Sequence, residues 1–424
     1  MSIFEKKDIP ILMRTMGRAG KAAASRLSIA SGDAKNIALT EAAKSLRLRS
    51  SQIVDANAKD MVAGVEKGLK GSFLERLLLD HASIESMAQG LEAIAMLTEP
   101  VGCILSKWER PNGLLIERVS TPLGVIGVIY ESRPNVTADA GGLCLKSGNA
   151  VILRGGSESF NSSNAIMVSL KEGLKIAGLP EASIQFVPTR DRDAVGELLR
   201  LTDYVDIIVP RGGKSLIERI SSESRIPMFK HLEGICHIYV DAAADEQMAR
   251  KIIVNAKMRR TGICGAAETV LVQRGIASNI LCSIVDDLVN AGCEVRGDAE
   301  ARAIDVRVVP AARDDWNTEY LDSIITIGVV EDVKAAIKHI AKHGSQHTDS
   351  IITQDDETAA IFLSEVDSAI VMVNASTQFA DGGEFGMGAE IGISTGKLHA
   401  RGPVGVEQLT SFKYLVHGTG QCRP

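Results

Sequence analysis

Residues 149–210, NAVILRGGSESFNSSNAIMVSLKEGLKIAGLPEASIQFVPTRDRDAVGELLRLTDYVDIIVP, decide the fold class of this 424-residue chain. Three short apolar runs, NAVILRG, SIQFVPT and VDIIVP, alternate with two segments whose apolar residues recur at helical spacing, 162–178 and 193–201. Short apolar strands separated by helices are typical of a parallel sheet that helices cover on both faces. This stretch therefore predicts an open, doubly wound α/β domain.

The same alternation continues on both sides of this stretch. GVIGVIY precedes it and CHIYVD follows it, and a second α/β region, 241–374, contains the strand candidates ETVLVQRG, SIITIGVV, SIITQ and SAIVMVN. Residues 10–98 are instead rich in Ala, Leu, Lys and Glu at helical spacing, which predicts several amphipathic helices. Because 424 residues exceed what one hydrophobic core organises, we expect two or three domains.

Two strand-like pieces lie outside the predicted sheets. Asn112-Gly113 separates two extended runs within residues 108–118, which is a strong hairpin signal. QLTSFKYLVHG, residues 408–418, is an extended amphipathic strand. Exposed strand edges usually pair with something, and another subunit is one such partner. These two pieces are therefore candidates for contact with another subunit, and a homo-oligomer is the corresponding expectation.

Composition excludes several classes of function. The chain is 45% hydrophobic and 24% charged with a net charge of −6, so nothing favours binding to nucleic acid or to an anionic membrane. Charges interrupt every apolar stretch near the N-terminus, which indicates neither a signal peptide nor a membrane span. The seven cysteines are scattered without CxxC pairs, so they predict neither a disulfide framework nor a zinc site. We expect a cytoplasmic globular protein.

The common nucleotide motifs are absent or incomplete. No GxGxxG run occurs, and the P-loop-like ending at Lys214 lacks its first glycine, because Ile208 stands there. Arg211-Gly212-Gly213 does join the strand VDIIVP to a helix, where backbone N–H groups and the helix dipole attract anions. Arg211 and Lys214 add positive charge. A plain glycine turn explains the same residues equally well.

Arg154 ends the strand NAVILRG, where α/β folds bind their ligands. Its guanidinium could pair with the extra phosphate of NADP, although an arginine solvated at a sheet edge is the simpler alternative. The triplet of His339, His343 and His347 is an unfavoured metal site, because Gly344 is expected to end their helix and no carboxylate or cysteine completes a ligand set.

Cys264 is the cysteine whose surroundings favour nucleophilic chemistry. Lys257, Arg259 and Arg260 precede it, and nearby cations favour the reactive thiolate. Small residues on both sides, including Gly265, leave room for a substrate. These residues alone leave a structural cysteine as the commoner alternative.

Four segments carry a family resemblance. Asn255-Ala256-Lys257, Cys264 and Glu268-Thr269 together resemble the nucleophile segment of the aldehyde dehydrogenase superfamily. Residues 130–156, 339–352 and 388–414 resemble, within that superfamily, the γ-glutamyl phosphate reductase family. The similarity spans nearly the whole chain. The pattern departs at Thr261 and Gly265, where relatives often have Pro and Asn, so the detailed shape of the pocket around the thiol stays open.

The resemblance implies a reaction and its residues. Cys264 would attack the carbonyl of L-glutamate 5-phosphate and form a thioester, which NADPH would reduce to L-glutamate 5-semialdehyde, the second step of proline biosynthesis from glutamate. Asn135 and the Cys264 N–H would bind the oxyanion. Glu233 receives no base role, because the thioester must be spared from water. The remaining implied residues are Arg154, Arg211, Gly212, Gly213, Lys214 and Glu319 for the cofactor, and Arg133, Lys257, His347 and Arg401 as substrate-binding candidates.

The resemblance also implies an aldehyde-dehydrogenase-like architecture, with two doubly wound α/β domains and a small β oligomerisation element. The NADPH-binding domain would comprise residues 1–104, 123–230 and 375–390, the catalytic domain 231–374, and the oligomerisation element 105–122 and 391–424. Functional coupling to glutamate 5-kinase is a further expectation. Two alternatives stay open: a CoA-acylating aldehyde dehydrogenase on the same scaffold, and a non-catalytic member that only binds partners.

Overall fold

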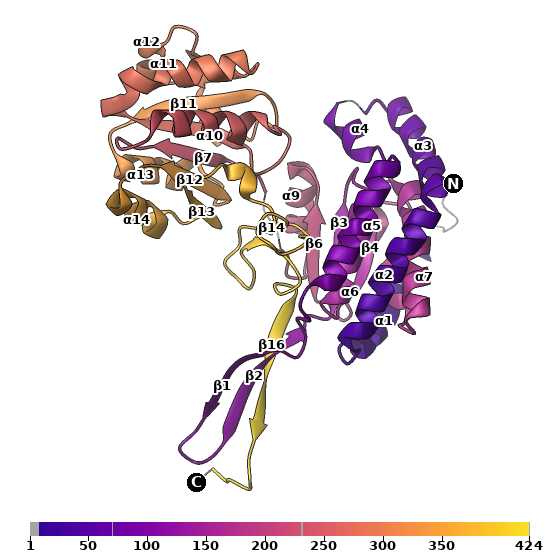
Figure 1. Ribbon diagram of the computed structural model, residues 1–424. Helices are drawn as coiled ribbons and strands as arrows, with labels where there is room; N and C mark the ends of the chain where they lie inside the picture. Colours follow the sequence, from indigo (N-terminus) through magenta and orange to yellow (C-terminus); the bar gives the residue numbers. More distant parts are fainter. Residues whose placement is uncertain (1–7, 70, 230–231, 424) are drawn as a thin grey trace. The chain divides into compact units, whose positions relative to one another are not determined.

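The computed structural model describes residues 8–69, 71–229 and 232–423. The chain forms two compact units, and Figure 1 shows their elements. The first unit comprises Met1–Lys230, Gly386–Gly392 and Val404–Pro424, and the second comprises His231–Phe385 and Ile393–Pro403. Each unit contains its own parallel sheet. The predicted α/β fold with two such domains is therefore confirmed.

Helices make up most of the chain before Met96, as the spacing of residues 10–98 predicts. Polar side chains begin two of them: Ser31 accepts the Ala34 N–H, and Asp80 accepts the Ser83 N–H. Their buried positions are mostly Ala, Leu, Ile and Met, so these helices pack through apolar faces. The helices are α1 (Ile9–Leu27), α2 (Gly32–Leu48), α3 (Ser50–Glu66), α4 (Ser72–Leu77) and α5 (His81–Met96).

The parallel sheet of the first unit has the strand order β5-β4-β3-β6. Every residue of its central strands β3 and β4 is buried, which explains why both sequences are apolar except at Arg154. The strand order reverses between β3 and β6, and α/β sheets bind ligands beside such a point. The elements are β3 (Val125–Tyr130), α6 (Val136–Lys146), β4 (Ala150–Gly155), α7 (Phe160–Ile176), η2 (Glu181–Ser183), β5 (Ile184–Phe186), α8 (Asp193–Leu198), β6 (Ile207–Arg211) and α9 (Lys214–Glu223).

The hairpin predicted at Asn112-Gly113 is confirmed. Strands β1 (Ile104–Glu109) and β2 (Leu115–Pro122) pair antiparallel, and β2 also pairs with the strand β16 (Thr410–His417) near the C-terminus. Gly113 has a φ of +81°, a left-handed conformation that glycine adopts without strain. We call this three-stranded antiparallel sheet the arm.

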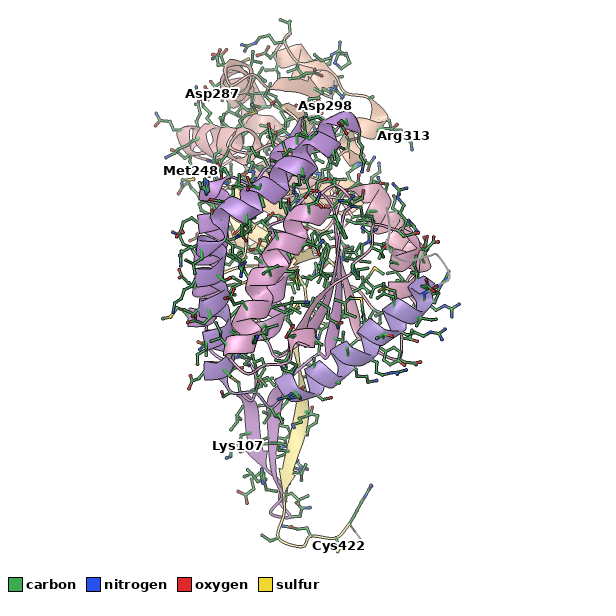
Figure 2. The ribbon with its side chains drawn as sticks, turned by 90° about the vertical axis from the view of Figure 1, so that its right-hand side faces the viewer. Lys107, Met248, Asp287, Asp298, Arg313 and Cys422 are labelled. Atoms are coloured by element: carbon green, nitrogen blue, oxygen red, sulfur yellow. The ribbon has the colours of Figure 1, made fainter. Side chains whose placement is uncertain are left out.

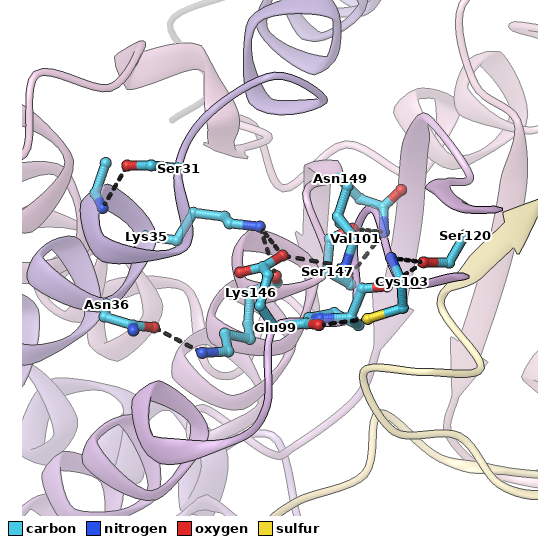
Figure 3. A network of polar contacts seen from close by, with 12 residues as sticks. Ser31, Lys35, Asn36, Glu99, Val101, Cys103, Ser120, Lys146, Ser147 and Asn149 are labelled. Atoms are coloured by element: carbon cyan, nitrogen blue, oxygen red, sulfur yellow. Dashed lines mark hydrogen bonds and ion pairs between the residues drawn. The ribbon is translucent and has the colours of Figure 1, made fainter. Parts of the chain in front are cut away.

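The arm extends away from the parallel sheet of the first unit (Figure 1), and Figure 2 shows Cys422 at the far end of the arm. Polar contacts fix the arm at its base (Figure 3). The Asn149 side chain donates to the carbonyl oxygen of Leu409, next to β16, at 2.8 Å. The fully buried ammonium of Lys35 pairs with Glu99, shortly before β1 begins. The arm is thus joined to the helices and the sheet of its own unit.

The second unit is built on a parallel sheet of order β10-β9-β11-β8-β7-β12-β13. Apolar cores cover both faces: Val270 packs in a cluster with Ile253 and Leu281, and its neighbour Leu271 packs in a separate cluster with Phe362. The strands are β7 (Cys236–Val240), β8 (Ala267–Gln273), β9 (Glu294–Gly297), β10 (Val309–Pro310), β11 (Ile324–Val330), β12 (Thr348–Ile352) and β13 (Ile370–Val373). The helices are α10 (Glu246–Met258), α11 (Arg274–Asn290), α12 (Ala299–Ile304), η3 (Arg313–Asn317), α13 (Val333–His343), α14 (Asp356–Glu365) and η4 (Thr377–Phe379).

The compact units differ from the predicted domain limits near the C-terminus. Residues 375–385 group with the second unit, because the Gln378 side chain donates to the carbonyl oxygens of Ala256 at 2.8 Å and Arg260 at 3.2 Å. The short strands β14 (Ile393–Ser394) and β15 (Gly402–Pro403) pair with each other, and both belong to the second unit. Residues 393–403, which were predicted to belong to the oligomerisation element, therefore lie outside the arm. The assignment of the units to cofactor and substrate stays a prediction.

Among the described residues, no helix combines the length and the apolar character needed to cross a lipid bilayer.

Candidate active site

Asn135 and Asp139 lie where the strand order of the first sheet reverses, just after β3. Asn135 is the N-cap residue of α6, and Asp139 follows one turn later. The Asn135 amide donates from Nδ2 to Asp139 Oδ2 at 2.9 Å. Removal from water raises the pKa of Asp139 to about 6, although the Asn135 hydrogen bond and the charge of Arg211 oppose this rise. Asn135 thus has one amide hydrogen fixed on a carboxylate and a second for another acceptor.

The predicted anion-binding turn lies between β6 and α9, at the same reversal point. Gly213 is the N-cap residue of α9, and Lys214 is the first residue of the helix. The Gly213 N–H donates to Glu131 Oε2 at 3.2 Å, and a Cβ on Gly212 would lie 2.6 Å from the same oxygen. The turn, which begins at Arg211, therefore binds a carboxylate in the structure, as its geometry predicts for anions.

Arg154 does not offer its guanidinium to a ligand in the way that its position at a strand end predicts. Its side chain is only 6% exposed and donates to the carbonyl oxygens of Gly155, Arg190 and Asp191, the latter two at 3.2 Å. Burial lowers the pKa of Arg154. Arg154 therefore holds the 190–191 loop in place, and this loop carries the exposed Arg190 and Arg192.

Cys264 lies in the loop between α10 and β8, which we call the nucleophile loop (residues 259–266). Two neighbours fix its backbone. The Cys236 thiol donates to the Cys264 carbonyl oxygen at 3.1 Å, and a Cβ on Gly234 would lie 2.0 Å from that oxygen. Because no side chain fits at position 234, the nucleophile loop packs directly on the segment that leads into β7.

Glu319 contacts the same segment, which leads into β7. It follows η3, and its Oε1 accepts the Gly234 N–H at 3.0 Å. The residue predicted to bind the nicotinamide ribose is thus linked to the backbone of Cys264 through one glycine. The structure therefore brings these two predicted site residues together within the second unit.

The four substrate-binding candidates differ in how deeply they are buried and in the partners that they already have. The Lys257 ammonium is fully buried, 2.5 Å from Glu268 Oε2, so it is unsuited to direct contact with a substrate anion. His347 is also buried, with Nδ1 2.9 Å from the Thr348 hydroxyl. Arg401 donates to the carboxylate of Asp367 at 2.8 Å. Arg133 is partly buried in the loop that carries Asn135.

The predicted three-histidine group is divided by the fold. His339 and His343 lie on α13, whereas His347 immediately precedes β12. Burial lowers the pKa of His339 to about 3, so its ring is neutral and packs edge-on against Trp316 with centroids 5.1 Å apart. Within the described ranges, no three or more His, Cys, Asp or Glu side chains are grouped to hold a metal ion.

Comparison with known proteins agrees with this geometry. The model of the aldehyde dehydrogenase family matches residues 80–306. The gamma-glutamyl phosphate reductase of Rhodospirillum rubrum is 64% identical over 417 residues, which cover 98% of both chains. The chain belongs to the aldehyde dehydrogenase family, in its γ-glutamyl phosphate reductase branch. Membership makes it an oxidoreductase that acts on a small molecule with a nicotinamide cofactor.

Solved structures of the family have the same fold. The crystal structure of the gamma-glutamyl phosphate reductase from Thermotoga maritima superposes with a TM-score of 0.95 at 44% identity, over 97% of this chain and 100% of that one. An acetylating aldehyde dehydrogenase from Geobacillus thermoglucosidasius superposes with a TM-score of 0.72 at 16% identity, over 98% of each chain. The second likeness concerns the fold alone.

One departure from the family pattern has a structural reason. A Cβ on Gly265, where the family resemblance led us to expect Asn, would lie 3.0 Å from the carbonyl oxygen of Thr377. The glycine therefore lets the nucleophile loop pack closely on the start of η4. Nothing in the structure explains Thr261 in the same way.

Several residues around these sites were not predicted. Asp139 stands four positions after Asn135, and this helical spacing is the local signal that could have shown the pair. Gly234 and Cys236 offered no such signal, because they contact Cys264 across nearly thirty positions of sequence. Glu268 was noted only as part of the motif around Cys264.

Proposed function

We propose that this chain catalyses the NADPH-dependent reduction of L-glutamate 5-phosphate to L-glutamate 5-semialdehyde and phosphate, the second step of proline biosynthesis from glutamate. The name of its relative at 64% identity supports the substrate. The observation that carries the chemistry is the loop of Cys264, whose backbone is fixed by Cys236 and Gly234 beside Glu319.

The proposed reaction has two steps at one carbon. The Cys264 thiolate attacks the acyl carbon, a C–S bond forms, and the C–O bond to phosphate breaks with its electron pair going to the leaving phosphate. When bound, NADPH supplies a hydride. After that hydride reaches the thioester carbon, the C–S bond breaks, and the aldehyde leaves as the thiolate is regenerated. No step requires activated water, so Glu233 has no base role.

Asn135 is proposed to stabilise the oxyanion of both steps together with the Cys264 N–H. Its hydrogen bond to Asp139 fixes the amide plane, so the second amide hydrogen has a defined direction before the substrate arrives. Arg133, His347 and Arg401 remain candidates for binding the charged groups of the substrate. Lys257 is not proposed to touch the substrate, because it is buried against Glu268.

The residues at the strand reversal fit a dinucleotide cofactor. Arg211, Gly212, Gly213 and Lys214 form a glycine turn at a helix start, and such turns bind phosphates through backbone N–H groups. A cofactor phosphate would take the place of the Glu131 carboxylate at the Gly213 N–H. Glu319 is proposed to bind the nicotinamide ribose.

Arg154 is proposed to favour NADPH indirectly, since it holds the loop that carries two exposed arginines. Those arginines are Arg190 and Arg192, which place positive charge near the carboxyl end of β4. A phosphate on the cofactor ribose would be attracted to that charge.

The substrate is tested against the rival reaction of a CoA-acylating enzyme. We expect NADPH consumption by the purified protein when glutamate, ATP and glutamate 5-kinase generate the acyl phosphate in the cuvette. Consumption should stop when either the kinase or ATP is omitted, and acetyl-CoA and propionyl-CoA should give only the background rate. Activity confined to the acyl-CoA compounds would contradict the proposed substrate, and cofactor binding without any turnover would favour a non-catalytic member.

We also propose a cytoplasmic location and functional coupling to glutamate 5-kinase. An acyl phosphate is hydrolysed readily by water, so its reductase gains when the kinase product reaches it quickly. The kinase and the reductase would then share one compartment.

We further propose that the chain is a homo-oligomer assembled through the arm. Phe412, Tyr414 and Val416 alternate along β16 and are each about half exposed. Successive odd or even positions of a strand share one face, so these side chains form an apolar patch. Trp108 of β1 meets Tyr414 edge to face with ring centroids 6.1 Å apart, which extends the patch across the sheet. A second copy of the same arm is the occupant proposed for this patch.

The oligomer is tested by a charge in the patch. We expect Tyr414→Glu to lower the sedimentation-derived mass to that of one chain, because burying an unpaired carboxylate in an apolar contact is unfavourable. Lys413→Glu is the matched control, since Lys413 is exposed on the opposite face of the same strand, and it should leave the mass unchanged. A single-chain mass for the unchanged protein would contradict the proposal.

A further inference from the structure

The nucleophile loop is closed at both ends by one buried ion pair. Lys257 lies in the last turn of α10, immediately before the loop, and Glu268 lies in β8, immediately after it. The ammonium of Lys257 is 2.5 Å from Glu268 Oε2, and the two side chains are 0% and 1% exposed. A contact between the residues that flank a loop fixes the separation of its ends. Cys264 is therefore carried by a loop whose base cannot widen without breaking this pair.

The same pair contacts the segment that carries Glu319. The Lys257 ammonium lies 5.7 Å from the centre of the Tyr320 ring, within the range of a cation–π contact. The backbone of Leu321 acts on the other member of the pair, since it opposes the rise in the pKa of Glu268 that burial causes. Leu321 has a φ of +52°, a left-handed conformation that is uncommon for leucine and needs support from its surroundings. Both members of the pair thus hold the residues that follow Glu319.

Glu319 in turn completes a closed circuit of contacts. Its Oε1 accepts the Gly234 N–H at 3.0 Å, and Gly234 packs on the backbone of Cys264. Cys264 therefore contacts Gly234, Gly234 contacts Glu319, and the segment after Glu319 contacts the ion pair at the base of the nucleophile loop.

We propose that Lys257 and Glu268 are positioning residues for the reaction, a buried ion pair that holds the nucleophile loop of Cys264 and the Glu319 segment in one fixed arrangement. The inference rests on the proposed function, because it assigns the two loops to the acyl group and the cofactor. It also replaces the predicted contact of Lys257 with substrate by an indirect role.

A contribution to the stability of the fold does not by itself explain why Lys257 and Glu268 form a buried charged pair. Removing two charges from water is costly, and apolar residues of similar volume often stabilise a protein equally well or better. Burial raises the pKa of Glu268 to about 8, and the charge of Lys257 opposes that rise, so the ionisation of the carboxylate depends on its partner. What the pair adds over an apolar contact is a directional link between two loops.

The test replaces both charges together. In Lys257→Met/Glu268→Leu neither charge is left unpaired, so we expect a folded protein whose unfolding midpoint is close to that of the unchanged protein. We expect kcat to fall by roughly a hundredfold, the effect typical of a small misplacement of reacting groups, with the KM for the acyl phosphate nearly unchanged. The rate at which iodoacetamide alkylates Cys264 should also depend on pH differently in the double variant than in the unchanged protein. This second measurement needs neither substrate nor cofactor.

Two further variants keep the test decisive. Glu268→Gln retains an acceptor for the Lys257 ammonium, so its kcat should lie between those of the unchanged protein and the double variant. It also covers the case in which the double variant fails to fold. Phe362→Ala opens a cavity in the separate apolar cluster of the same unit, which includes no residue of α10 or of either loop, and it should lower the unfolding midpoint without lowering kcat.

Each outcome has a separate meaning. A folded double variant with normal kcat and a normal alkylation profile would overturn the positioning role. A loss of kcat in Phe362→Ala equal to that in the double variant would also overturn it, because general destabilisation would then explain the effect. An altered alkylation profile in a protein inactive on the acyl phosphate would support the positioning role and contradict only the proposed substrate.

Discussion

Replacing Cys264 by alanine is expected to abolish turnover while leaving the fold intact. The proposed acyl intermediate forms only on this sulfur, and removing a catalytic nucleophile costs on the order of a millionfold in rate in a serine protease. Cys264 lies in a loop and is partly exposed, so the loss of its sulfur leaves both apolar cores of the second unit unchanged. We expect kcat to fall by at least about ten-thousandfold. Cys264→Ser should behave in the same way.

The measurement uses the reverse direction, in which L-glutamate 5-semialdehyde, NADP and phosphate give NADPH. Cys282→Ala is the matched control, because Cys282 is an exposed thiol on α11 and should be replaceable without loss of rate. Mass spectrometry of the peptide that contains Cys264 should detect an acyl adduct of the unchanged protein when semialdehyde and NADP are supplied without phosphate. A normal rate in Cys264→Ala, or an adduct on another cysteine, would contradict the mechanism.

The parallel strands were predictable because their physical signal is local. A strand buried on both faces is a continuous apolar run, and β3, β4 and β8 were identified in this way. β9 was missed because Glu294 and Arg296 interrupt it, so it has no apolar run to detect. β5 was predicted too long, since it ends at Phe186, shortly before a proline that cannot donate to a sheet.

The site was predictable where chemistry follows from residue type, and not where it depends on contacts between distant segments. Cys264 and Glu319 were found through the family motif, and the structure links them through Gly234. Arg154 and Lys257 were both taken for ligand-binding cations because their charge is visible in the sequence and their partners are not. Arg154 binds backbone carbonyls some 36 residues away, a contact that only the folded chain defines.

Replacing Asn135 by alanine is expected to lower kcat by roughly a hundred- to a thousandfold, the usual loss for one oxyanion donor. The KM for the acyl phosphate should change little, because the donor acts on charge that develops after binding. Steady-state rates in both directions check the expectation. Asp139→Asn is the matched control: it keeps the size of the side chain that holds Asn135 but removes its charge, so its loss of kcat should be smaller. Normal kcat in Asn135→Ala would exclude the proposed donor.

The ionisation of Asp139 should also make the Asn135 hydrogen bond depend on pH. Its pKa is raised from the ordinary 3.8 to about 6, so the folded protein binds this proton more tightly than the unfolded chain does. Protonation of Asp139 therefore contributes stability below pH 3.8, and this contribution is lost as the pH rises through about 6. Activity should follow the opposite direction, because only the ionised carboxylate holds the Asn135 amide as a strong acceptor. We expect kcat to decline below about pH 6 in the unchanged protein but not in Asp139→Asn. If both proteins declined equally, another group would control the amide, and the hydrogen bond between Asp139 and Asn135 would be structural only.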